Sequence, residues 1–174
     1  TNNRLVQVNT SNGALMGMAS VDQPLGNLFA HRGNLISASP TSVAVYYVQD
    51  NLRSTVDQRL ALDSQDVWAL NQKSQLAMFD GKLDQAYELL TTSLSIDQTN
   101  VDTRYLLTEA LLSGLAKDFS KYSQLAAEVE DIVEYGPQRF RFFQWLALGN
   151  IRANQHLAAF KRLFDLMRFR LSPL

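Results

Sequence analysis

The 174-residue chain contains no cysteine, which excludes disulfide frameworks, cysteine-ligated zinc sites and thiol catalysis and leaves the redox compartment open. Histidine is almost absent as well. His31 and His156 stand in different segments, and neither has a second histidine or a carboxylate at the spacing of helical metal ligands. No apolar run approaches the roughly 18 residues that a membrane-spanning helix needs. We therefore expect no metal, no cofactor and no membrane span.

Catalytic motifs are missing too. Glycine is sparse, with 8 residues, and the segments SGLAKDF and GNLFAHRG lack the features of a phosphate-binding loop. We interpret His31 and Arg32 as polar residues of a turn, and the acidic group at positions 128–134 as a solvated helix face, because its spacing is not that of an EF-hand loop. Catalysis needs a nucleophile, a base or metal ligands brought together. We expect that the chain is not an enzyme.

The net charge of −1 hides an uneven distribution along the chain. Residues 50–134 hold 15 acidic and 7 basic side chains, whereas residues 136–174 hold 7 basic side chains against Asp165 alone. Overall attraction to nucleic acid is therefore not expected. Self-association between the acidic and the basic segment, which salt would weaken, remains one possibility.

Residues 1–46 have the pattern of short strands. Apolar residues at 5–8 and 14–19 flank the sequence NTSNG, in which Asn12-Gly13 can take the positive φ of a hairpin turn. Two further strands flank a turn at 32–34, and SVAVYY predicts another. About five strands are expected. We set the domain boundaries at 1–46 and 47–174.

From Tyr47 onward the apolar period changes from 2 to 3.6, which predicts about seven helices. The first helix carries an apolar stripe at Val48 and at every fourth residue to Leu60. The next five helices are expected at about 66–79, 82–96, 100 onward, 119–132 and 137 onward. Tyr105 and Phe140 are expected to point inward. The seventh helix follows Asn154, and we expect its apolar residues to belong to the core: Leu157, Phe160, Leu163, Phe164 and Met167.

The first strands resemble a known repeat. RLVQVNTSNGALMG, residues 4–17, looks like the repeat of PQQ-type β-propellers. The matching positions are Leu5, Val6, Val8, Gly13 and Leu15, with Asn9 where the family has Asp and Gly17 or Met18 where it has Trp. Propellers are rings of at least four blades with four strands each. The resemblance implies that residues 1–46 are a partial blade, whose earlier blades lie in a longer parent chain.

The helical part resembles another repeat. Val67 to Asn100 is one unit of 34 residues similar to a tetratricopeptide repeat (TPR). The matching residues are Gly81, Leu83, Asp84, Ala86, Leu94, Ile96, Asp97 and Asn100. The implied fold is mainly α: a right-handed, TPR-like α-solenoid of about seven helices after a short antiparallel β segment. The combination is similar to large propeller proteins of planctomycete-type bacteria, which implies a periplasmic or cell-envelope location.

The function that this resemblance implies is a non-catalytic protein–protein interaction or scaffold module of a larger envelope protein. Two alternatives stay open: an accessory helical domain of a PQQ-type dehydrogenase-like enzyme, and a self-assembling structural envelope component. The expected partner is another protein or the rest of the parent chain. Nucleic acid is not expected.

Candidate partner-binding residues come from two sources. TPR grooves use Lys, Arg and Asn on the first helix of each pair, and the basic C-terminal segment interleaves Arg with aromatic residues. The candidates are Asn71, Lys73, Arg104, Arg139, Arg141, Arg152 and Arg162. For the basic segment, which also holds Arg170, we favour aromatics in the core and Arg in solvent over a docking face or a phosphate site. Exposure of Trp145 or Phe169 would favour an interface.

Overall fold

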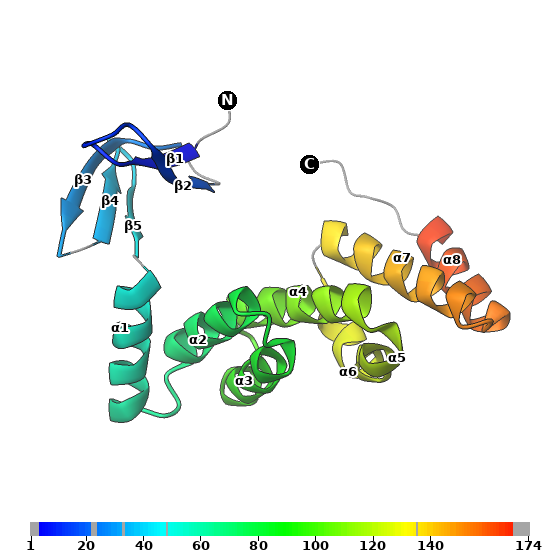
Figure 1. The fold of residues 1–174 in the computed structure, drawn as a ribbon. Coiled ribbons are helices and arrows are strands. Elements are labelled where there is room, and N and C mark those ends of the chain that lie inside the picture. The colour runs from blue at the N-terminus through cyan, green and yellow to red at the C-terminus, as the bar shows by residue number, and fades with distance from the viewer. Residues whose placement is uncertain (1–3, 22–23, 33, 48, 135, 169–174) are drawn as a thin grey trace. The chain divides into compact units, whose positions relative to one another are not determined.

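The computed structural model describes residues 4–21, 24–32, 34–47, 49–134 and 136–168 (Figure 1). Val48, Phe169 and Arg170, for which the sequence made predictions, lie outside these residues. The protein is mainly helical, with small antiparallel β-sheets, as predicted. It divides between Ser54 and Thr55 into two compact units, which are described separately here. Among the described residues, no helix combines the length and hydropathy that crossing a bilayer demands.

The N-terminal unit contains the five predicted strands. A two-stranded hairpin pairs β1 with β2, and a three-stranded antiparallel sheet has the order β3-β4-β5. Their bounds are β1 Arg4–Val8, β2 Leu15–Ser20, β3 Asn27–His31, β4 Asn34–Ala38 and β5 Val43–Tyr46. Gly13 has a φ of 70°, which confirms the predicted positive φ in the first turn.

The strands of this unit have little core of their own. Of its described residues, Ser37 is the one classed as buried, and its Oγ accepts a hydrogen bond of 2.8 Å from the backbone N–H of Gly26. A sheet of two or three strands is stable only when one apolar face is covered. Little of the surface of these strands is buried, so they lack this source of stability.

The helical unit follows the predicted boundaries closely. The longer helices are α1 Gln49–Leu62, which crosses the unit boundary, α2 Val67–Phe79, α3 Leu83–Ile96, α4 Val101–Lys117, α7 Gly136–Arg152 and α8 His156–Arg168. Local sequence explains several ends. Asp66 caps α2 by accepting from the N–H of Ala69, and Asn100 caps α4 by accepting from that of Thr103. After α2, the N–H of Lys82 bonds to the carbonyl of Ala77, the six-to-one bond of a Schellman motif.

The predicted fifth helix is wrong as a continuous element. Residues 119–132 form four short pieces instead: α5 Phe119–Tyr122, the 3₁₀ turn η1 Ser123–Leu125, α6 Ala126–Val129 and the 3₁₀ turn η2 Glu130–Ile132. The inward spacing survives, because Tyr122, Ala126, Val129 and Val133 are all buried. The buried side chains hold the segment in place, although its backbone hydrogen bonds alternate between the α-helical and the 3₁₀ pattern.

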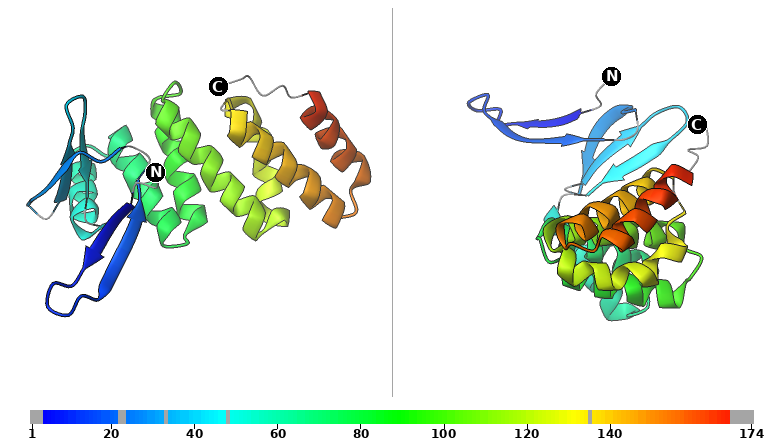
Figure 2. Two further views of the ribbon diagram at one scale, coloured as in Figure 1. Left: turned by 90° about the horizontal axis from the view of Figure 1, so that it is seen from above. Right: turned by 90° about the vertical axis from the view of Figure 1, so that its right-hand side faces the viewer.

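From α2 onward, the longer helices of this unit pack side by side in chain order (Figure 2). Helix α2 packs on α3, α4 packs on both, α7 packs on α4, and α8 packs on α7. The main core lies among α3, α4, the short pieces and α7, with members Leu90, Leu107, Leu111, Leu115, Phe142, Phe143 and Leu146. Gly149 of α7 permits the closest approach, since a Cβ there would stand 2.0 Å from the ring of Phe119.

Candidate partner-binding surfaces

The apolar stripe of α8 is exposed, so the prediction that it belongs to the core is wrong. Leu157 is 72% exposed, Phe160 65% and Met167 83%. Leu163 and Phe164 are also classed as exposed, and the rings of Phe160 and Phe164 stack with centroids 6.2 Å apart. We call these five residues the α8 face.

Helix α8 is held by its opposite side. Ala159 is buried, and Leu166 packs against the main core. Arg162 places its guanidinium 5.5 Å from the centroid of the Phe143 ring in α7 and donates to Glu130 at 2.8 Å. Because α7 and η2 hold this side, the apolar side chains of the α8 face are left toward solvent.

The neighbouring helix α7 adds exposed apolar residues. Phe140, Leu148 and Ile151 are all classed as exposed, which contradicts the inward position predicted for Phe140. Tyr105 of α4, also predicted inward, is exposed too. Trp145, by contrast, is half-buried and packs against the core. Exposure of Trp145 would have favoured an interface, but the exposed aromatic side chains of this region are Phe140, Phe160 and Phe164.

One face of the three-stranded sheet is a second exposed apolar surface. The strand register sets Phe29 opposite Ile36, and Ile36 opposite Val45, so the three side chains form one row across the sheet. Phe29 and Val45 are exposed, and Val43, two residues before Val45 on the same face, is 71% exposed. We call these four residues the sheet face.

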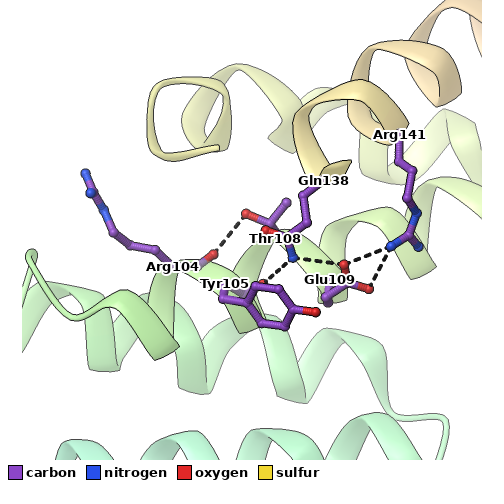
Figure 3. A network of polar contacts seen from close by, with 6 residues as sticks. All are labelled: Arg104, Tyr105, Thr108, Glu109, Gln138 and Arg141. Carbon is purple, nitrogen blue, oxygen red and sulfur yellow. Dashed lines mark hydrogen bonds and ion pairs between the residues drawn. The ribbon is translucent and has the colours of Figure 1, made fainter. Parts of the chain in front are cut away.

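The basic residues of α7 are engaged inside the unit. Arg141 donates to both carboxylate oxygens of Glu109 in α4, at 3.0 and 3.4 Å. The buried Gln138 donates to the same carboxylate at 2.8 Å and to the carbonyl of Tyr105 at 3.1 Å (Figure 3). Arg139 donates to the carbonyl of Val133 at 3.0 Å. The acidic middle and the basic end thus pair partly within one chain.

Two other candidates also have partners within the chain. The Nη1 of Arg104 in α4 donates to Glu134 at 2.7 Å, and its side chain points away from the Glu109 network in Figure 3. Lys73 of α2 donates to Asp57 of α1 at 3.2 Å. The pair of Lys73 and Asp57 is exposed on both sides and contributes little to stability, whereas the Arg104 side chain is about three-quarters buried beside the exposed Glu134.

Asn71 lies in a buried polar network that joins three helices. The residue is 4% exposed, and its amide nitrogen donates to Thr103 of α4 at 2.9 Å. Its amide oxygen accepts from Ser93 of α3 at 2.9 Å and from Thr103 at 3.1 Å. A partner would have to break these bonds to reach this side chain. The structure therefore gives Asn71 a packing role.

Arg152 and Lys161 differ from the other basic residues. Both are exposed, and within the described part of the chain no acidic partner reaches either of them. Lys161 stands on α8 four residues after Leu157 and three before Phe164, which places it beside the α8 face. Arg152 ends α7, and Lys161 lies within α8.

A group of titratable side chains lines an open pocket of about 400 Å³ between the start of α3 and α5. Asp84 accepts from Lys121 at 2.6 Å and from the hydroxyl of Tyr122 at 2.7 Å, and these bonds lower the pKa of its carboxyl. Burial and the Asp84 carboxylate raise the pKa of Tyr122 to about 12. The described residues include no cluster of three or more metal-ligating side chains, here or elsewhere.

No protein-family model, curated protein or solved structure matches the chain in the three comparisons made.

The exposed α8 face was the feature that sequence reasoning missed. The signal was present, because α8 carries apolar residues on two sides: Ala159 and Leu166 on one, and the α8 face on the other. Because α7 and η2 both contact α8 from the same direction, one of these two sides is buried and the other is exposed.

Proposed function

We propose that the chain is a non-catalytic protein–protein interaction module, the scaffold part of a larger assembly. The observation that carries the proposal is the α8 face, five large apolar side chains left exposed on one helix. Contiguous exposed apolar patches of this kind mark interaction sites, because a soluble surface gains nothing from keeping such side chains in water.

We further propose that the helical unit is a TPR-like α-solenoid. Three features support this. Helices α2 and α3 lie within one 34-residue segment and pack as a pair joined by a short turn. Helix α4 packs on both of them, and the later helices follow in chain order. Ala86, a small residue matched to the repeat, is 0% exposed at the contact of α3 with its neighbours. Such arrays offer extended surfaces for proteins.

For the N-terminal unit we propose the tail of a propeller blade in a bacterial envelope protein. The antiparallel order β3-β4-β5 and the uncovered sheet face support an incomplete sheet that needs a neighbour. Binding would then use two surfaces of different kinds: the sheet face for β structure and the α8 face for another partner.

Native mass spectrometry of the protein isolated from its source tests this proposal, together with the denatured mass of its chain. A complex, or a parent chain much longer than 174 residues, is expected. Two variants assign the surfaces: Phe29→Thr with Val45→Thr for the sheet face, and Phe160→Asp for the α8 face. A lone monomer of 19.6 kDa in every preparation would refute the proposal.

A further inference from the structure

We propose that Asn12 is a modification site, whose side-chain amide is lost by spontaneous deamidation when the backbone nitrogen of Gly13 attacks the side-chain carbonyl carbon. The attack requires the loop of the β1–β2 hairpin to open. This inference does not depend on the proposed interaction function. It is carried by the sequence of the loop, by its exposure and by its hydrogen bonds.

The residue that follows Asn12 is the first reason. Asn12-Gly13 is the one place in the sequence where an asparagine precedes a glycine. The attacking nitrogen belongs to the following residue, so a side chain on that residue crowds the five-membered ring that forms, and glycine has none. Both residues are exposed, and a Cβ added to Gly13 would meet nothing within 4 Å. No neighbouring group therefore covers the two reacting atoms.

The hydrogen bonds of the loop favour one reacting group and restrain the other. The N–H of Ala14 donates to Oδ1 of Asn12 at 3.0 Å, which draws electrons from the side-chain carbonyl carbon and makes it more open to attack. The N–H of Gly13 donates to the carbonyl of Asn9 at 2.8 Å. Because this bond holds the nitrogen that must attack, the loop has to open before the ring can form.

Opening of this hairpin requires little free energy. Strands β1 and β2 form a two-stranded sheet, and their residues are exposed or half-buried (Figure 1). An isolated hairpin of two strands is marginally stable, and such elements open locally far more often than a core does. The ladder also changes register between Gln7 and Val8, close to the loop.

The reaction needs only water and hydroxide. In the opened loop the Gly13 nitrogen loses its proton to hydroxide and forms a bond to Cγ of Asn12. The bond from Cγ to Nδ2 breaks, and the amide nitrogen takes up a proton from water and leaves as ammonia, so a cyclic imide remains. Nothing is oxidised or reduced in this step.

Water then opens the imide at one of its two carbonyl carbons. Cleavage of the new bond between Cγ and the Gly13 nitrogen gives an aspartate, whereas cleavage at the main-chain carbonyl gives an isoaspartate. Either product carries a new carboxylate and releases a proton. The isoaspartate also inserts one carbon into the main chain, so the 2.8 Å bond from the N–H of Asn9 to the carbonyl of Ala14 cannot keep its geometry.

Asn154 is a matched control within the same chain. It is an exposed turn residue, and the N–H of the residue after it, Gln155, donates to the carbonyl of Asn150 at 2.8 Å. Exposure and a restrained nitrogen are therefore common to Asn12 and Asn154. The two sites differ in the side chain of Gln155, which crowds the ring, so Asn154 should keep its amide.

Mass spectrometry of tryptic peptides tests the inference on the whole chain, incubated in mildly alkaline buffer and sampled over time. The peptide of residues 5–32 should gain the mass of an amide-to-acid change, which fragmentation places at Asn12, about tenfold sooner than Asn154 changes. The rate should rise with hydroxide concentration. In urea, where the N–H of Gly13 is released from Asn9, the rate should be higher still.

Two variants separate the chemistry from the fold. Asn12→Gln lengthens the side chain, disfavours the five-membered ring and should keep its amide. Gly13→Ala, compared with the wild type in urea so that strain in the turn has no effect, should deamidate about tenfold more slowly. Equal rates at Asn12 and Asn154, an unchanged rate in Gly13→Ala, or faster loss in the folded chain than in urea would overturn the inference.

Discussion

Replacing Asn71 with alanine should cost the helical unit about 2–3 kcal/mol of stability, because it removes the side chain that joins α2, α3 and α4. The amide nitrogen of Asn71 donates to Thr103 and its amide oxygen accepts from Ser93, and all three residues are buried. A lost intramolecular hydrogen bond costs about 0.5–1.5 kcal/mol, and truncating a buried side chain also leaves a cavity. The remaining bond between Ser93 and Thr103, of 3.1 Å, and that of Thr103 to Asn100 soften the loss, so the expected cost is below the sum.

Urea denaturation followed by far-UV circular dichroism measures this loss, since the helices supply most of the signal. A lower midpoint with an unchanged slope is expected for Asn71→Ala. A double-mutant cycle with Ser93→Ala should show coupling of about 1 kcal/mol, because the two side chains share a bond. A loss below about 0.5 kcal/mol for Asn71→Ala would place it among ordinary surface substitutions and refute the buried network as a stabilising element.

Three further predictions concern single residues. Gly149→Ala should destabilise the helical unit by about 1–3 kcal/mol in the same denaturation assay, because the added Cβ would overlap the ring of Phe119, and Phe119→Ala in the same chain should recover part of the loss. The hydrogen bond from Arg59 lowers the pKa of Asp66 in the folded state. The stabilisation from this bond is therefore present above the ordinary pKa of an aspartate and is lost as the pH falls through the lower folded value. In Asp66→Asn, the urea midpoint of unfolding should fall less between about pH 5 and pH 2 than in the wild type. The pKa of Tyr122 is raised to about 12, so the stabilisation from this residue is present below the ordinary tyrosine pKa of about 10 and is lost as the pH rises toward 12. Tyr122→Phe should therefore lose less stability than the wild type as the pH rises above about 10. An equal loss in both proteins would contradict the burial of Tyr122.

Local structure was predictable where a few residues decide it. The hairpin turn follows from Gly13 and its flanking strands, and the start of α2 follows from Asp66 as an N-cap. The end of α2 follows from Asp80-Gly81, since no continuous helix is favoured there. In each case the deciding interactions lie within about five residues, which is the range that sequence patterns report.

Whether an apolar helix face is buried was harder to predict. A 3.6-residue period indicates that a helix has such a face, but it does not indicate which neighbour, if any, covers the face. Tyr105, Phe140 and the α8 face all have the period of core residues, and all are exposed. Charge patterns have the same limit. The arginines of the basic C-terminal segment were expected in solvent, yet Arg141 bonds to Glu109, which stands 32 residues earlier in the chain.

The division of residues 119–132 into short pieces also lay beyond the pattern. Its inward residues keep nearly helical spacing, so periodicity alone predicts one helix. The structure instead satisfies the packing of Tyr122 and Val129 with 3₁₀ turns between short α segments. Tertiary packing decided the backbone there, and single-sequence reasoning has no access to it.

Hydrogen–deuterium exchange, comparing the isolated chain with the complex purified from its source, tests most directly whether the α8 face binds a partner. The account predicts that backbone amides of α8, residues 156–168, exchange more slowly in the complex, while those of α2 are unchanged. Protection confined to other helices, with α8 exchanging at the same rate in both samples, would contradict it.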